Sequence, residues 1–153
     1  MAAGVVPRTE LLRTSGLLNE DGTVDVDPGM RTAAAGLFAA GDIARAHHPA
    51  AGPRLTVEHW GDAVTMGGIA GANAAGDSRM WSDVPGFWST IGDRTIKYVA
   101  WGDGFDDESV QEHAGGGFTV WYRRDGALVG GLTHLADDDY EKAADLIAAD
   151  GRR

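Results

Sequence analysis

A short apolar run closed by a glycine and an aspartate reads Leu37-Phe38-Ala39-Ala40-Gly41-Asp42. This pattern is typical of a buried strand that feeds a loop. A glycine at the end of a strand lets the backbone come close to a ligand, and an aspartate there accepts hydrogen bonds from the hydroxyl groups of a sugar or polyol. Aspartate is also a common turn former, so a plain turn or cap at Asp42 is the alternative interpretation.

A long helix is expected at residues 57–75, where apolar residues recur at helical spacing and proline is absent. Its N-terminus, next to Glu58-His59-Trp60, would offer free N–H groups and partial positive charge. That environment suits a phosphate, or an electron-rich ring that gains negative charge on reduction. The small residues of this helix would let it lie close to a sheet or a flat cofactor; they are Gly61, Ala63, Gly67, Gly68, Gly71 and Ala72. Helix packing by the glycines and ordinary packing by Trp60 are the alternatives.

Small residues dominate the composition. Alanine and glycine together make up 47 of the 153 residues, whereas Leu, Ile, Val and Phe together make up only 30, which argues against a self-sufficient core. The formal charge of −10 makes nucleic acids and anionic membranes poor partners. Because the chain has no cysteine, disulfides, thiolate metal sites and iron–sulfur ligation are excluded, and redox chemistry would need a cofactor.

Neither a membrane span nor a signal peptide is evident in the sequence. No run approaches the roughly 18 apolar residues that a spanning helix needs. Residues 1–7 contain neither a basic region nor a long apolar stretch. A cytoplasmic location is therefore expected.

Two modules are indicated by the distribution of residue types. Residues 32–76 hold 14 alanines and 8 glycines, whereas residues 77–153 hold 15 acidic residues and most of the tryptophans. The turn formers Gly76-Asp77-Ser78-Arg79 mark the expected boundary, which gives modules 1–78 and 79–153.

Each module has its own expected elements. The first contains strands at residues 5–6 and 23–27, a helical turn within residues 9–18, a loop at residues 45–54, and the strand and helix described above. The second contains strands at residues 95–101, 118–122 and 127–132, with an Asp125-Gly126 hairpin turn, and a helix at residues 140–149. The sequence thus predicts an α+β chain with a small antiparallel sheet in its second half.

Taken in order, the motifs resemble one family, the FAD-dependent pyridine nucleotide oxidoreductases of the ferredoxin, rubredoxin and putidaredoxin reductase type. The main blocks are Gly4-Val5-Val6-Pro7-Arg8-Thr9-Glu10-Leu11-Leu12, Val24-Asp25-Val26-Asp27, residues 37–42, and Arg54-Leu55-Thr56-Val57-Glu58-His59-Trp60. The resemblance implies that residues 1–78 are the C-terminal part of an FAD-binding α/β domain. It implies that residues 79–153 are the reductase C-terminal domain, a small sheet with a helix.

The resemblance also implies cofactors and roles. FAD would be the cofactor, with NAD(P)H as co-substrate and a ferredoxin- or rubredoxin-like iron–sulfur protein as electron acceptor. Asp42, after Gly41, would hydrogen-bond the ribityl and pyrophosphate region of FAD. Glu58, His59 and Trp60 would lie at the pyrimidine edge of its ring system. No catalytic side chain and no metal are expected, because the flavin itself carries the electrons.

The chain departs from this family at several points. Neither of the family's G-x-G-x-x-G loops is present, and Met66 stands where many relatives have glutamine. We therefore expect a C-terminal fragment that is inactive alone and is completed by the missing N-terminal portion or by another subunit. The alternative is a non-catalytic interaction module or subunit derived from a reductase tail.

Other polar clusters have ordinary interpretations. His47-His48 is expected to be a solvated loop, and residues 106–108 and 137–139 are expected to be solvated turn and helix-start charges. A small basic spot for an acidic ferredoxin is an option, with ordinary surface charges as the favoured alternative; it would comprise Arg94, Lys97, Arg123 and Arg124.

Overall fold

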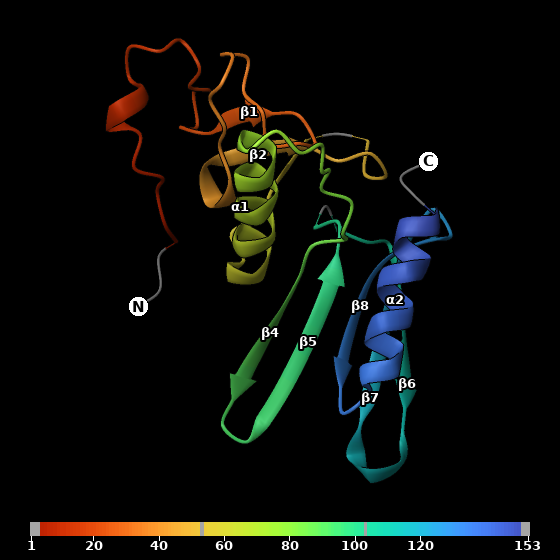
Figure 1. Cartoon of the computed structure of the whole chain (residues 1–153). Helices are drawn as coiled ribbons and strands as arrows, with labels where there is room; N and C mark the ends of the chain where they lie inside the picture. The colour runs from red at the N-terminus through yellow and green to blue at the C-terminus, as the bar shows by residue number, and fades with distance from the viewer. Residues whose placement is uncertain (1–3, 53, 103, 151–153) are drawn as a thin grey trace. The chain divides into compact units, whose positions relative to one another are not determined.

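The computed structural model describes residues 4–52, 54–102 and 104–150, which form two compact units, Met1–Ser82 and Asp83–Arg153. The first unit contains strands β1 (Val24–Val26), β2 (Ala44–His47) and β3 (Arg54–Thr56), helix α1 (Trp60–Ala74), and the 3-10 turns η1 (Glu10–Leu12) and η2 (Gly41–Ile43). The second contains β4 (Gly86–Ile91), β5 (Arg94–Ala100), β6 (Asp107–Glu112), η3 (Ala114–Gly116), β7 (Phe118–Arg124), β8 (Ala127–His134) and α2 (Asp137–Asp150) (Figure 1).

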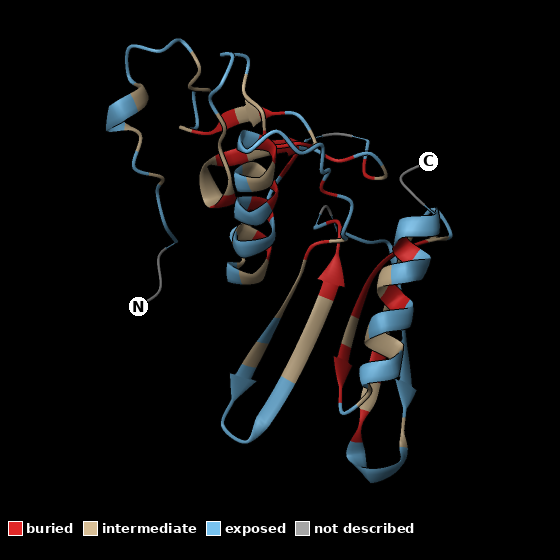
Figure 2. Ribbon diagram, in the orientation of Figure 1, coloured by how far each residue is buried: buried red, intermediate tan, exposed pale blue. Residues whose placement is uncertain are grey.

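The first unit is built on a small three-stranded sheet. β1 is parallel to β2, and β2 is antiparallel to β3. Burial alternates along β1 and β2, with Val24, Val26, Ala44 and Ala46 inside. The buried side chains of these two strands are valine and alanine, whereas Met30, Met66 and Trp81 supply the large buried groups of the unit. Figure 2 shows which stretches of the chain are buried.

Two local predictions for the first unit are wrong. Residues 37–40 do not form a strand: Phe38 makes an isolated antiparallel bridge with Arg31, and Leu37 is 38% exposed. A strand needs a neighbour along its length, and the described residues supply one only at this bridge. Residues 45–54 are not simply a loop, because β2 begins at Ala44 and β3 begins at Arg54. Small and charged residues alternate in β2, and the absence of large apolar side chains hid the strand.

The remaining predictions for the first unit have mixed outcomes. The expected helix is confirmed as α1, and the strand expected around residues 23–27 is confirmed as β1. Only one 3-10 turn, η1, forms within residues 9–18. The strand expected at Val5 and Val6 is absent from the described structure, and both side chains are exposed.

The second unit is one antiparallel sheet in the order β4-β5-β8-β7-β6, and α2 contacts β8 and β5 (Figure 1). The predicted strands appear as β5, β7 and β8, and the predicted helix appears as α2. The hairpin turn is confirmed: Asp125 and Gly126 both have positive φ, +50° and +82°, as a type I′ turn requires. β4 and β6 were not predicted. Every residue of β6 is exposed, so its sequence carries no apolar alternation.

Glycine allows α2 to approach the sheet closely. A Cβ on Gly131 of β8 would lie only 2.9 Å from the Ala143 Cβ, so a larger residue would push the helix away. Ala143 and Ile147 are fully buried on this side of α2. These contacts give the second unit an apolar core of its own.

The first unit ends at Ser82, and hydrogen bonds hold its last segment. The buried Asn73 side chain donates to the carbonyl oxygens of Gly29 and Arg79 and accepts from the Arg79 N–H. The Trp81 N–H donates to the Pro28 carbonyl at 2.8 Å. The expected boundary between the modules 1–78 and 79–153 stays a prediction.

Among the described helices, none combines the length and apolar character that a bilayer crossing requires.

Candidate functional site

The predicted glycine and aspartate lie in a tight turn against α1. Gly41 is buried at φ +73°, and a Cβ there would lie 3.2 Å from the Ala63 Cβ in the first turn of the helix. Glycine meets both demands of this position, left-handed backbone and close approach. The turn therefore brings Asp42 to the beginning of α1, and two predicted parts of the site come together.

The Asp42 carboxylate is available to a ligand. Asp42 is half-buried, and its side chain has no hydrogen bond or ion pair with any residue that the structure describes. The N-cap residue of η2 is Ala40, and Asp42 follows inside the turn. A carboxylate in this state can accept hydrogen bonds from hydroxyl groups.

The start of α1 carries the other three predicted residues. His59 is the N-cap residue, with extended backbone and no cap bond from its own side chain. Trp60 is 76% exposed and Glu58 is also exposed. Such a helix end can donate hydrogen bonds to a negatively charged or electron-rich group.

The carboxylate of Asp62, which the sequence analysis did not single out, holds the His59 ring. The His59 Nδ1 lies 3.0 Å from the Oδ2 of Asp62, and Asp62 is only 7% exposed. Because an ionised carboxylate only accepts, the proton lies on Nδ1 in this pair. The spacing of three residues within a helix is the sequence signal that could have predicted the pair of His59 and Asp62.

One face of α1 is open and built from small residues. A Cβ added at Gly67, Gly68 or Gly71 would meet no other group within 4 Å, and Val64 is 56% exposed. With Trp60, these positions recur at helical spacing along one side. The glycines therefore do not serve close packing against any described residue.

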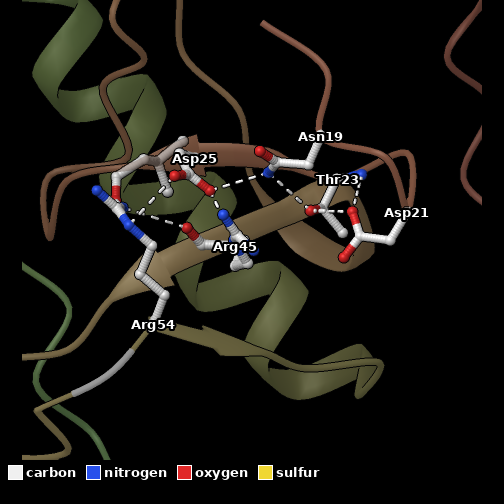
Figure 3. A network of polar contacts seen from close by, with 7 residues as sticks. Asn19, Asp21, Thr23, Asp25, Arg45 and Arg54 are labelled. Carbon is white, nitrogen blue, oxygen red and sulfur yellow. Dashed lines mark hydrogen bonds and ion pairs between the residues drawn. The ribbon is translucent and has the colours of Figure 1, made fainter.

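Figure 3 shows a polar network that joins the three strands next to this site. Asp25 of β1 accepts from the Arg45 Nε at 2.6 Å and from the Asn19 side-chain amide at 2.9 Å, and its other oxygen lies 3.4 Å from the Arg54 Nε. Arg54 also donates to the Val26 carbonyl. The hydrogen bond from Arg45 lowers the pKa of Asp25 below its ordinary value. Since β2 directly follows η2, the network fixes the strand that comes after Asp42.

The same network closes the turn before β1. Asp21 accepts from the Thr23 hydroxyl at 2.6 Å and from the Thr23 N–H at 2.9 Å, and these bonds lower the pKa of Asp21. Asn19 donates to the Thr23 hydroxyl. The sequence predicted the strand but not these contacts, although their partners lie only two and four residues apart along the chain.

His48 is buried, which corrects the prediction of a solvated His47-His48 loop. His47 is exposed, but His48 is 0% exposed, and its ring meets that of the buried Trp81 edge-on at 4.9 Å. Its Nδ1 accepts from the N–H groups of Ala50 and Ala51. Residues 44, 46 and 48 are buried alternately, so the alternation of β2 continues to His48. Among the described residues, no group of three or more His, Cys, Asp or Glu side chains could hold a metal ion.

The chain was compared with known proteins. The family model for pyridine nucleotide-disulphide oxidoreductases matches residues 1–77. The ferredoxin–NAD(+) reductase component of the Burkholderia cepacia anthranilate 1,2-dioxygenase system is 32% identical over 148 residues, which are 95% of this chain and 36% of that protein. Human apoptosis-inducing factor 3 is 29% identical over 151 residues, 95% of this chain and 25% of that protein.

The fold comparison agrees with the sequence comparison. A ferredoxin reductase from Rhodopseudomonas palustris has a TM-score of 0.84 and 24% identity, and the match covers 98% of this chain and 37% of that one. The chain thus spans between a quarter and about two-fifths of the length of these three proteins. Its homologues are FAD-dependent oxidoreductases that use NAD(P)H. The chain belongs to the pyridine nucleotide-disulphide oxidoreductase family, and within it to the ferredoxin-reductase type.

Proposed function

We propose that this chain forms the flavin-facing part of an FAD-dependent NAD(P)H oxidoreductase of the ferredoxin-reductase type. One observation carries the proposal: the Asp42 carboxylate, which pairs with no described residue, is held beside the start of α1 by the close approach of Gly41 to Ala63. Hydroxyl acceptor and N–H donors thus stand together, and FAD has groups for both.

The residues present fit this cofactor. Asp42 would accept hydrogen bonds from hydroxyl groups of the ribityl chain, and Gly41 allows the turn that carries Asp42 to lie against Ala63. Glu58, His59 and Trp60 would meet the pyrimidine edge of the ring system, where the helix N–H groups favour negative charge. FAD, when bound, supplies hydride acceptance and the release of single electrons.

The side chains at the start of α1 orient the His59 ring and act on water. Asp62 accepts from the Nδ1 of His59 and so orients the imidazole ring at the start of α1. The exposed indole of Trp60 and the small-residue face of α1 would cover the ring system and exclude water from it.

The rest of the enzyme must come from other residues. Both G-x-G-x-x-G loops would be supplied by an N-terminal reductase portion or by another subunit, since this sequence contains neither. NAD(P)H would donate the hydride, and a ferredoxin- or rubredoxin-like iron–sulfur protein would accept the electrons. A cytoplasmic location belongs to this proposal.

A reconstitution experiment tests the proposal. The chain is co-expressed with a polypeptide that carries the two glycine-rich loops of a ferredoxin reductase, and the purified complex is scanned for flavin absorbance. A yellow complex that NADH bleaches is expected. A colourless complex that takes up no FAD would contradict the enzyme assignment and favour the non-catalytic interaction module.

A variant pair tests the site itself. In the reconstituted complex Asp42→Ala should lose most of the flavin, because the hydroxyl acceptor is gone. Asp145→Ala removes a carboxylate from an exposed position of α2 in the second unit, and it should keep the flavin. Equal flavin content in the two variants would refute the role of Asp42.

A further inference from the structure

Three polar residues lie side by side across the second-unit sheet. Lys97 of β5 and Thr119 of β7 both stand opposite Thr133 of β8 in the antiparallel register. Residues opposite one another in such a ladder project to the same face. On this face the next residues of β5 and β8, Val99 and Gly131, lie under α2 and are apolar. The polar row is thus a distinct feature at the end of the apolar core.

The first turn of α2 pairs with the two outer members of this row. The Lys97 ammonium lies 2.8 Å from an Asp137 carboxylate oxygen. The Thr119 hydroxyl donates to Asp139 at 2.6 Å, and the His113 Nε2 lies 3.1 Å from the same oxygen. Two of the three aspartates expected to be solvated helix-start charges therefore have defined partners.

Thr133, the middle member, has no such partner. Its residue is 1% exposed, and its hydroxyl makes no hydrogen bond with any described residue. A hydroxyl that no protein group satisfies takes its hydrogen bonds from whatever occupies the space that it faces. Thr133 lines a groove of about 820 Å³ between the sheet and the start of α2, entirely within the second unit. The groove is the place from which its partner would come.

The lining of the groove decides the charge of that partner. Three carboxylates, Asp137, Asp138 and Asp139, face one lysine. Lys97 and His113 each have a carboxylate partner, whereas Asp138 has no ion pair with a described residue. The surplus charge is negative, which favours a cation.

Apolar walls complete the groove. Ala114, Leu135 and Ala136 line it beside the polar row, and Leu135 is 70% exposed. We propose that the groove binds a primary alkylammonium group. The ammonium donates to Thr133 and Asp138, and the methylene groups lie against Leu135.

Amide NMR on the full 153-residue chain tests this. Titration with 1,4-diaminobutane should give saturable shifts at Thr133, Leu135 and Asp138, whereas 1,4-butanediol, of equal length and without charge, should give none. Blocked lysine, with its α-amino and carboxyl groups capped, distinguishes a free small amine from the lysine side chain of a partner protein. If blocked lysine binds as tightly as the diamine, the groove is assigned to a lysine side chain of a partner. Absence of saturable shifts up to about 10 mM diamine would overturn the proposal, as would shifts caused by inorganic phosphate but not by diamine.

Variants of the groove residues distinguish binding in the groove from a general attraction of the diamine to an acidic chain. Asp138→Asn and Thr133→Val should each weaken diamine binding by about tenfold, since a hydrogen bond to a charged group is lost. Asp145→Asn removes the same charge from α2 outside the groove and should leave the affinity unchanged. Equal weakening by Asp138→Asn and Asp145→Asn would show that the diamine responds only to net charge, and the proposal would fall. Asp138 is exposed, so its replacement does not threaten folding.

Discussion

Residues 83–153 and residues 1–82 differ in how their strands are joined. The second unit has strands of six to eight residues in one antiparallel sheet, with Ala143 and Ile147 of α2 fully buried against it. The strands of the first unit are three or four residues long, and ion pairs around Asp25 join them. Its helix α1 leaves a small-residue face uncovered. Both units bury apolar side chains, in the first unit Met30, Met66 and Trp81 among others. The comparison teaches that long ladders join the strands of the second unit, whereas the short strands of the first unit add polar cross-links, and its helix offers a surface to another part.

Truncation of the second-unit core should have the largest effect. Ile147→Ala removes a fully buried side chain and should lower the free energy of unfolding of the second unit by about 3 kcal/mol, because a cavity remains. Urea unfolding followed by the amide NMR signals of β8 measures the loss. Leu146→Ala, next to it on α2 but 43% exposed, is the control and should cost less than about 1 kcal/mol. Equal losses would deny the second unit a core of its own.

A single added methyl group should be the next most damaging change, this time in the first unit. Gly41→Ala meets both a positive φ of +73° and the Ala63 Cβ at 3.2 Å, and should cost about 2 kcal/mol. Gly36→Ala, at φ +78° with no group within 4 Å, isolates the backbone cost and should lose about 1 kcal/mol. The amide signals of β2 report both. If the two variants lose the same amount, Ala63 does not constrain the turn.

Local patterns carried most of the fold prediction. The helix at α1 and the β7–β8 hairpin were predictable because helical spacing and the Asp125-Gly126 pair act within a few residues. β6 was not, because an edge strand exposed along its whole length has no apolar period. β2 was not, because alanine in place of larger apolar residues weakens the same signal.

The candidate site shows where such prediction ends. Gly41, Asp42 and the start of α1 were chosen from the sequence, and the structure brings them together; the roles assigned to them toward FAD stay predictions. The contact of Gly41 with Ala63 joins positions 22 residues apart, and the Asp25 network joins three strands. No short window of sequence specifies either one. His48 was misjudged for the same reason, since its partner Trp81 lies in the last segment of the first unit.

Removal of the central carboxylate tests the polar cross-links. Asp25→Asn keeps the shape of the side chain but loses the ion pairs with Arg45 and Arg54, and should destabilise the first unit by about 1 kcal/mol, since Asp25 is 40% exposed. The signals of β8 in the second unit should not change. If Asp25→Asn lowered the stability of both units, the two units would not be stabilised separately.

The same variant reveals the pH dependence. The hydrogen bond from Arg45 lowers the pKa of Asp25 in the folded state, so its stabilisation is present above the unfolded pKa of about 3.9 and is lost as the pH falls through the lower, folded value. The first unit should therefore lose stability below about pH 4 more steeply in the parent chain than in Asp25→Asn. Urea unfolding at a series of acidic pH values measures both slopes, and parallel slopes would exclude Asp25 as the cause.

The smallest expected effect is a gain in stability instead of a loss, and it tests why α1 keeps its glycines. Gly68→Ala adds a Cβ that meets nothing within 4 Å, and alanine favours the helix, so this chain should gain about 0.8 kcal/mol. A glycine that costs stability persists when its open surface serves another contact. In the reconstituted reductase the same change should therefore lower flavin content or weaken assembly. Gly76→Ala, just beyond α1 at φ +99°, should instead lose stability. Gly68→Ala that stabilises the chain and leaves assembly and flavin untouched would show that this face of α1 has no partner.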